Sequence, residues 1–332
     1  MLKFVSAIIP CRNEKKFIVQ CLDSVITQDY PKDRMEILVA DGMSEDGTQD
    51  ILQEYSRRYS FLRWVENPKK IQACALNNLI GQSKGEIIIR LDAHSNFPKD
   101  YVSNCVKYLG EYKVDNIGGI IETLPGADTN VARSIAWALA TPFGVGGSKF
   151  RLGVSKPTMV ETVPLGCYRR EIFSEIGLFN ENLIRNEDNE FNARLLKAGG
   201  RILLHPGINS SYFARPDIRS LADQHFRNGY WCVYGIKFSE RPFFLRHLVP
   251  MGLMTFLLLS LFFGIWLRPL LWAGLAVLGL YGFCVFITSA ILILKRNIKH
   301  FPYFLLIFPS LHFSYGIGSL CGLVKLLTPE KK

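Results

Sequence analysis

Apolar and polar positions follow two alternating periods over the first 125 residues. Continuous apolar runs, typical of buried strands, lie at residues 4–9, 36–40, 62–65, 86–91 and 116–121. Between them, apolar residues recur at helical spacing over residues 17–26, 48–59, 71–80 and 100–112. This alternation predicts an α/β domain built on a mainly parallel, Rossmann-like sheet with helices on both faces. Neither a Gly-x-Gly-x-x-Gly nor a Walker loop is present, so a dehydrogenase or P-loop enzyme is not expected.

The C-terminal part of the chain has a different pattern, with long apolar stretches at residues 248–267, 270–294 and 301–324. The first two have the roughly 20 apolar residues that a bilayer span requires. Pro302 and Pro309 interrupt the third, which is either a further span or a re-entrant or interfacial segment. We therefore predict a soluble domain over residues 1–246 and a membrane region of two to three hydrophobic helices over residues 247–327.

The charge pattern favours a cytoplasmic N-terminal domain on a multi-pass protein of the cell (inner or plasma) membrane. Basic and histidine side chains flank the apolar stretches at positions 237, 241, 246, 247, 295, 296, 299 and 300. Such residues stay on the cytoplasmic side of membranes. The net charge of +10 comes without a Lys/Arg run interleaved with aromatics, so nucleic acid is not an expected partner. The apolar run near the N-terminus is too short for a signal sequence and fits a strand.

The eight cysteines are scattered singly, without any Cys-x-x-Cys pair. This spacing indicates neither a zinc site nor a disulfide framework, and it fits a reduced compartment.

Polar residues stand where three of the predicted strands end. The first strand is followed by the loop of residues 10–14 and the second by Asp41, while the strand of residues 86–91 leads into Asp92-Ala93-His94. Carboxyl ends of parallel strands meet at one sheet edge, where open α/β sheets bind ligands. An Asp-x-His pair there can hold a divalent cation against a nucleotide diphosphate. Each aspartate can also be a plain turn residue or helix cap.

A second acidic cluster lies at Glu187 and Asp188, followed by helical spacing and a Gly199-Gly200 stop. One interpretation is an acidic first helical turn that stabilises the helix dipole. The other interpretation, a general base, depends on a resemblance to known proteins.

Taken in order, these motifs resemble those of family 2 glycosyltransferases of the GT-A fold. Such proteins carry a Pro-x-x-Asn-Glu-type loop, a Val-Asp-x-x-Ser-x-Asp-x-Thr segment and an Asp-x-Asp triplet, and the likeness covers residues 4–231. The chain is also similar to membrane-anchored exopolysaccharide transferases of the succinoglycan type. Those share the Asp-Ala-His variant, the glycine-rich segment of residues 144–151 and the hydrophobic tail.

The resemblance implies donor-site roles for the residues at the strand ends. It implies a nucleoside loop of Pro10, Arg12 and Glu14, and a base contact at Asp41. Asn77 matches a position near the nucleotide, although a plain helical polar residue is an equal alternative. Asp92 would face the ribose and the metal-bound diphosphate, and His94 would ligate the metal with it. His replaces the usual second Asp, and imidazole suits Mn²⁺ better than Mg²⁺.

The same resemblance implies the reaction. Asp188 would be the catalytic base and Glu187 its neighbour, in an inverting transfer of sugar from a nucleotide-diphosphate sugar to a lipid-linked or other saccharide acceptor in cell-surface polysaccharide biosynthesis. Alternatives are a polyprenyl-phosphate glycosyltransferase, a sugar-nucleotide pyrophosphorylase, and a non-catalytic membrane scaffold. The pyrophosphorylase would need a glycine-rich basic loop after the first strand, which residues 10–14 do not provide.

Overall fold

The computed structural model describes residues 2–239 and 245–328. The chain divides into two compact units, each built from two segments of sequence. The first unit is Met1–Glu122 with Lys149–Tyr212, and the second is Thr123–Ser148 with Phe213–Lys332. The second unit thus combines the apolar C-terminal helices with residues 123–148 and with the segment that begins at Phe213. The functional boundary expected at residue 246 is a separate question and stays a prediction.

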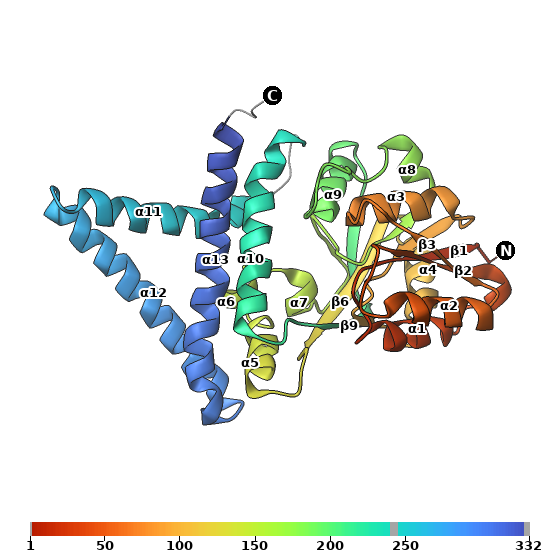
Figure 1. The fold of residues 1–332 in the computed structure, drawn as a ribbon, viewed down its shortest axis with the longest axis horizontal. Coiled ribbons are helices and arrows are strands. Elements are labelled where there is room, and N and C mark those ends of the chain that lie inside the picture. The colour runs from red at the N-terminus through yellow and green to blue at the C-terminus, as the bar shows by residue number, and fades with distance from the viewer. Residues whose placement is uncertain (1, 240–244, 329–332) are drawn as a thin grey trace. The chain divides into compact units, whose positions relative to one another are not determined.

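The sheet has the strand order β3-β2-β1-β4-β8-β6-β9-β5, with β7 paired to β9. Figure 1 labels β1, β2, β3, β6 and β9 of this sheet. β1 pairs in parallel with β2 and β4, and β2 with β3. β8 is antiparallel to β4 and β6, and β5 and β7 are antiparallel to β9. The strands are β1 Val5–Cys11, β2 Met35–Asp41, β3 Leu62–Glu66, β4 Ile87–Arg90, β5 Ser95–Asn96, β6 Asn116–Leu124, β7 Thr158–Met159, β8 Cys167–Arg169 and β9 Ile202–Phe213. The predicted parallel core of an α/β sheet is confirmed.

Helices cover both faces of this sheet because its strands are apolar on both sides. Along β1, Val5, Ala7 and Ile9 belong to one buried core, whereas Ile8 belongs to the other. The first core includes α1, α2 and α4, and the second includes α3, α8 and α9. The bounds of these helices are α1 Ile18–Ile26, α2 Thr48–Arg58, α3 Gln72–Gln82, α4 Tyr101–Glu111, α8 Glu171–Glu175 and α9 Glu187–Lys197. The same unit contains the short helix α7 Lys149–Leu152.

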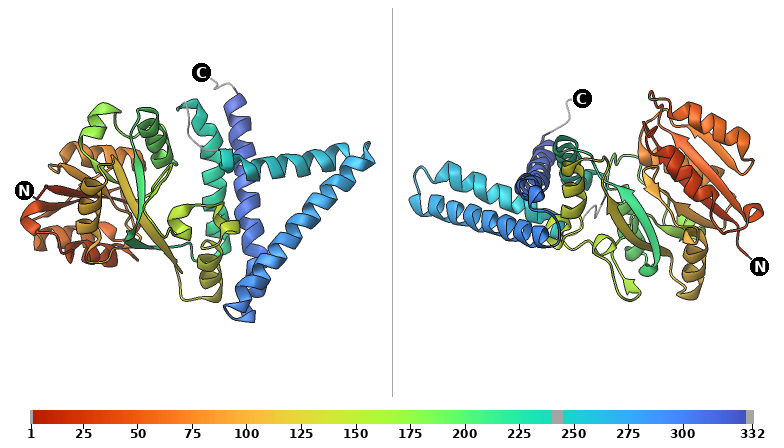
Figure 2. Two further views of the ribbon diagram at one scale, coloured as in Figure 1. Left: turned by 180° about the vertical axis from the view of Figure 1, so that it is seen from behind. Right: turned by 90° about the horizontal axis from the view of Figure 1, so that it is seen from below.

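The second unit is helical apart from the strand ends that enter it. Its helices are α5 Asn130–Ala138, α6 Pro142–Val145, α10 Ile218–Tyr234, α11 Val249–Phe263, α12 Arg268–Leu294 and α13 Phe301–Leu327. Figures 1 and 2 show α10 and α13 side by side. Their backbones approach closely at Gly229 and Gly318, where an added Cβ would meet the carbonyl oxygens of Tyr315 and Phe226. Small residues permit this kind of close helix packing.

Two helices of the described chain are long and apolar enough to cross a membrane, Arg268–Leu294 and Ile298–Leu327. The first apolar stretch forms a shorter helix, and its role as a further span stays a prediction. α11 has 15 residues, which at 1.5 Å per residue gives about 22 Å, less than the roughly 30 Å of a bilayer core. The third stretch instead forms one continuous helix despite Pro309.

Candidate active site

The three predicted strand ends lie at one edge of the sheet, because β1, β2 and β4 are neighbours and parallel. In the register of β1 and β2, Cys11 stands opposite Asp41, and in that of β1 and β4, Ile8 stands opposite Arg90. The loops that carry Glu14, Ser44 and Asp92 therefore leave the sheet together. This is the ligand-binding edge of an open α/β sheet.

Asp41 is fully buried at the end of β2 and is held by the loop that follows. One carboxylate oxygen accepts hydrogen bonds from the backbone N–H of Ser44 at 2.9 Å and from Gln49 Nε2 at 2.7 Å, and the other accepts from Ser44 Oγ at 2.5 Å. Two carboxylate oxygens offer about four acceptor positions. Cys11 Sγ is a further donor to the second oxygen, at 3.8 Å. These contacts support the turn interpretation of Asp41, and its contact with a nucleoside base stays a prediction.

The loop after β1 is tied to the loop after β2 through backbone and side-chain hydrogen bonds. Asn13 has a positive φ of 55°, and its N–H donates to Ser44 Oγ at 2.7 Å while its Oδ1 accepts from the Glu45 N–H at 2.9 Å. The Glu14 N–H donates to Thr48 Oγ1 at 3.0 Å. These contacts fix the direction in which Glu14 leaves the loop.

The three residues predicted for the nucleoside loop have different environments. Pro10 is buried within β1, so its contribution to a ligand site is the course of the backbone. Arg12 is exposed and its side chain lies against Gly42, where an added Cβ would stand 3.1 Å from Arg12 Cβ. Glu14 turns toward His94.

His94 and Glu14 form an ion pair, with His94 Nδ1 and Glu14 Oε1 2.9 Å apart. Burial alone would lower the pKa of His94, but the hydrogen bond to Glu14 and neighbouring negative charges outweigh it and raise this pKa to about 9. The ring also packs edge-to-face on Tyr212 at 5.0 Å, and Arg151 lies over the Tyr212 ring at 5.0 Å. The hydrogen bond through Nδ1 directs Nε2 away from Glu14.

Asp92 and the Glu187-Asp188 cluster meet at Arg90, the last residue of β4. Arg90 Nη2 lies 3.0 Å from Glu187 Oε1 and 3.8 Å from Asp92 Oδ1. α9 begins after Asn186, whose φ is 64°, and its first turn contains Glu187 and Asp188. The Asp188 carboxylate accepts the Asn189 N–H at 2.8 Å. The two acidic motifs, although 96 positions apart in sequence (188 minus 92), therefore belong to one site.

Burial dominates the ionisation of the two carboxyls on α9. It raises the pKa of Glu187 to about 7, although the charge of Arg90 works against it and the charge of Asp188 adds to it. Burial also raises the pKa of Asp188, again partly offset by Arg90. A carboxyl with a raised pKa is closer to the range in which a general base operates.

Asp92 and His94, at the end of β4, are the side chains that would hold a divalent cation as two protein ligands. No group of three or more His, Cys, Asp or Glu side chains in the described ranges is arranged for a metal ion. Asp92 and His94 are both partly exposed, and Glu14 on Nδ1 is the carboxylate–histidine arrangement that orients Nε2 toward a metal. The remaining positions would suit diphosphate oxygens and water. Such an ion competes with the proton of His94.

Asn77 joins α3 to the segment before α9. Its Nδ2 donates to the Phe179 carbonyl at 2.8 Å and to Glu181 Oε1 at 3.1 Å, and its Oδ1 accepts the Phe179 N–H at 2.9 Å. These contacts favour the structural alternative for Asn77, and the nucleotide role stays a prediction.

Sequence reasoning missed Arg90, Tyr212 and Gln49. A signal for Arg90 was available, because a charged residue within the apolar run of residues 86–91 has to find a buried partner. Tyr212 and Gln49 carry no such signal, since an aromatic in a strand and a glutamine on a helix are ordinary.

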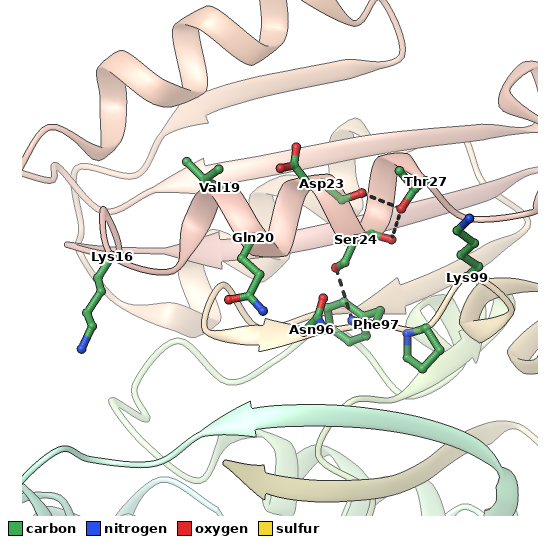
Figure 3. A pocket seen from close by; sticks show the side chains of 10 residues that line it. Lys16, Val19, Gln20, Asp23, Ser24, Thr27, Asn96, Phe97 and Lys99 are labelled. Carbon is green, nitrogen blue, oxygen red and sulfur yellow. Dashed lines mark hydrogen bonds between the residues drawn. The ribbon is translucent and has the colours of Figure 1, made fainter. Parts of the chain in front are cut away.

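A separate hollow of ≈ 680 Å³ lies between α1 and the segment around β5 (Figure 3). Gln20 from α1 and Asn96 from β5 face it, and Lys16 and Lys99 stand toward its two ends. None of the residues predicted for the nucleotide, the metal or the base lines it.

Comparison with known proteins identifies the family. The model of glycosyl transferase family 2 matches residues 6–177, which is more than half of the chain. The chain belongs to this family. It is a glycosyltransferase with a GT-A-like fold, as the motifs predict.

Relatives of similar length support this assignment. The chain is 32% identical over 78% of its length, and 81% of the relative's, to a dolichyl N-acetyl-alpha-D-glucosaminyl phosphate 3-beta-D-2,3-diacetamido-2,3-dideoxy-beta-D-glucuronosyltransferase of Methanococcus voltae. It is 28% identical to the succinoglycan biosynthesis protein ExoA of Rhizobium meliloti, over 82% of this chain and 81% of that protein. This family 2 glycosyltransferase thus matches most of each relative.

Among solved structures, this chain is similar to the mannosyltransferase PcManGT from Pyrobaculum calidifontis in complex with GDP-Man and Mn²⁺. The match covers 96% of this chain and 87% of the mannosyltransferase chain. The TM-score is 0.63 at 21% identity, which establishes a common fold. GalNAc-T7 with UDP, GalNAc and Mn²⁺ has a TM-score of 0.51 at 18% identity, over 70% of this chain and 50% of that one.

Proposed function

We propose that this glycosyltransferase moves a sugar from a nucleotide-diphosphate sugar to a hydroxyl of a lipid-linked saccharide, with inversion at the anomeric carbon, in the synthesis of a cell-surface glycan. The observation that carries the proposal is the meeting of Asp92 and the Glu187-Asp188 cluster at Arg90. It provides acidic groups for the donor and a base for the acceptor within one site.

The donor side of the proposal rests on the strand ends. Asp41 would contact the nucleoside base by exchanging one of its loop hydrogen bonds for the ligand, and Arg12 and Glu14 belong to the neighbouring loop after β1. Asp92 and His94 would hold a divalent cation, which when bound would stabilise charge on the departing nucleotide diphosphate as a Lewis acid. The imidazole ligand favours Mn²⁺ over Mg²⁺.

On the acceptor side, Asp188 would take the proton of the attacking hydroxyl. Its pKa is raised by burial, and its carboxylate is oriented by the Asn189 N–H. Attack from the face opposite the leaving group inverts the anomeric configuration in a single displacement. Holding donor and acceptor in line supplies a large part of the rate.

The acceptor class is proposed from the relatives and the apolar helices. One relative is named for transfer to a dolichyl-linked sugar and another for succinoglycan biosynthesis. Two helices of this chain have the length and composition of membrane spans, and the turn between them is basic, with Lys295, Arg296 and Lys299. If α11 and α12 form a hairpin whose two basic ends, at Arg246 and at Lys295 to Lys299, stay inside, the active site is cytoplasmic and lies beside a lipid-linked acceptor. It fits a polyprenyl-phosphate acceptor as well, which is the second candidate.

A labelling experiment on membranes tests this function. Membranes that contain the full-length chain are incubated with a panel of radiolabelled sugar nucleotides and with lipid extracts of the source organism. The proposal predicts label in the organic phase for one donor, and none with an Asp92→Asn variant. Label found only in water-soluble products, or only in a lipid that carried no sugar before the reaction, would contradict the proposed lipid-linked saccharide acceptor.

A protease-protection experiment tests the orientation. A tag on the N-terminal domain should be cleaved in inverted vesicles and protected in right-side-out vesicles. Cleavage from the outer side contradicts a cytoplasmic site.

A further inference from the structure

β4 ends in a charged residue that is almost entirely buried. Arg90 is 4% exposed and follows three isoleucines. Its Nη2 reaches both Glu187 at 3.0 Å and Asp92 at 3.8 Å. A charge of this kind is expensive to bury unless it is paired and fully hydrogen-bonded.

The hydrogen bonding of Arg90 is incomplete. Its Nε and Nη1 are buried without a hydrogen-bond partner in the part of the chain that the structure describes. Burial lowers the affinity of the guanidinium for its proton, and the charges of Glu187, Asp92 and Asp188 more than restore it, so that its pKa is raised. An ion pair with unsatisfied nitrogens is a poor device for stability. Stability therefore does not explain why Arg90 lies between the two acidic motifs.

Three carboxylates surround this single cation. Asp92 comes from the donor side at the end of β4, whereas Glu187 and Asp188 come from the first turn of α9. Without a cation between them, these carboxylates would repel one another and take up protons. Both contacts come from Nη2, which donates a hydrogen bond to Glu187 and pairs with Asp92 at a longer distance. The planar guanidinium fixes the place of this nitrogen, whereas the ammonium group of a lysine ends a flexible stem.

We propose that Arg90 is a positioning residue that holds Asp92 and Glu187 in fixed relation, so that the donor contacts and the base on α9 are aligned for transfer. The inference rests on the proposed function for the roles of Asp92 and Asp188. It adds that one buried side chain sets both halves of the site.

The effects of Arg90 and Glu187 should therefore differ in kind. Arg90→Lys keeps the charge and loses the rigid guanidinium plane that places Nη2, so it disturbs Asp92 as well as Glu187. Glu187→Gln leaves Asp92 with its cation. Arg194→Lys is the matched control, because Arg194 pairs with Glu190 one turn further along α9, at 2.6 Å, away from both motifs.

The experiment measures two quantities on the full-length protein, the dissociation constant for a nucleoside diphosphate with Mn²⁺ by calorimetry, and kcat for transfer. Arg90→Lys should weaken nucleotide binding and lower kcat by about 10- to 100-fold each, the usual effect of losing a residue that orients metal or active-site ligands. Glu187→Gln should lower kcat and leave nucleotide binding within about twofold, and Arg194→Lys should leave both within about twofold. In the Arg90→Lys, Glu187→Gln double variant, kcat should fall less than the two single losses multiplied.

Folding is checked by the melting temperature of each variant. If Arg90→Lys does not fold, Arg90→Met with Glu187→Met removes both charges of the pair, and it should still weaken nucleotide binding because Asp92 has lost its cation. Folded Arg90 variants with unchanged nucleotide binding would overturn the inference. Nucleotide binding requires no acceptor, so a wild type that binds the nucleotide and transfers no sugar refutes the proposed function while the role of Arg90 is still decided.

Discussion

Replacing Asp188 by asparagine removes the proposed base with the least change of shape. Asp188 lies in the first turn of α9, and its Oδ1 accepts the Asn189 N–H at 2.8 Å. An asparagine side chain can keep that hydrogen bond through its carbonyl oxygen. It cannot take a proton, so the substitution tests the chemistry of this position apart from its packing.

The size of the effect follows from what a general base contributes. Loss of such a group lowers kcat by roughly 10²- to 10⁴-fold, or about 3–5 kcal/mol in the barrier. Donor affinity should change little, because the proposed donor contacts lie on β1, β2 and β4. A fall in kcat with binding retained marks an interaction made mainly in the transition state.

The assay compares kcat for sugar transfer with donor affinity by calorimetry, on wild type and Asp188→Asn. Glu171→Gln is the control, since Glu171 also lies in an acidic first turn, that of α8, and is exposed. Near-normal turnover of Asp188→Asn would refute the assignment of the base. Loss of donor binding together with kcat would show that Asp188 belongs to the donor site.

Three further predictions concern neighbouring residues. His94→Ala should lower donor affinity and kcat together, and activity that persists in excess chelator would rule out the metal role. The pKa of Glu187 is raised from 4.5 to about 7, so between these values the folded state binds more protons than the unfolded state. The stability of the protein should therefore fall as the pH rises from about 4.5 to 7. The melting temperature of Glu187→Gln should change less over that pH range, and an equal dependence on pH in wild type and variant would contradict this. Asn77→Ala should lower the free energy of unfolding by about 1–3 kcal/mol because it leaves the Phe179 backbone groups unpaired. Unchanged stability with weakened donor binding would instead support the nucleotide role.

The α/β core was predictable from sequence because its signals are local. The alternation of apolar runs and helical spacing locates β1 to β4 and α1 to α4 within a few residues. A parallel arrangement then brings Glu14, Asp41 and Asp92 to one sheet edge. Each of these steps depends only on neighbouring residues and on general sheet geometry.

The contacts inside the site depend on partners that are distant in sequence. Arg90 pairs with a glutamate 97 positions away and Asn77 bonds a backbone 102 positions away. No periodicity indicates such pairs, so the bridge by Arg90 and the structural contacts of Asn77 were not predicted.

In the apolar region, neither the prolines nor the length of an apolar stretch was enough to predict where a helix ends. Pro302 lies in the first turn of α13, where its missing N–H costs nothing. Pro309 is inside the helix, and neighbouring helices can satisfy the carbonyl that it leaves free. The stretch of residues 248–267 is apolar throughout, but its helix ends at Phe263.

The central claim is that this chain uses a nucleotide-diphosphate sugar as donor through the site at β1, β2, β4 and α9. The most direct test is release of nucleoside diphosphate by the purified full-length protein, measured across a panel of sugar nucleotides with Mn²⁺ and a lipid-linked saccharide fraction. The account predicts acceptor-dependent release from one donor or one closely related set, and its loss in Asp188→Asn. Release that is independent of acceptor and unchanged in Asp188→Asn, or no release from any donor, would contradict it.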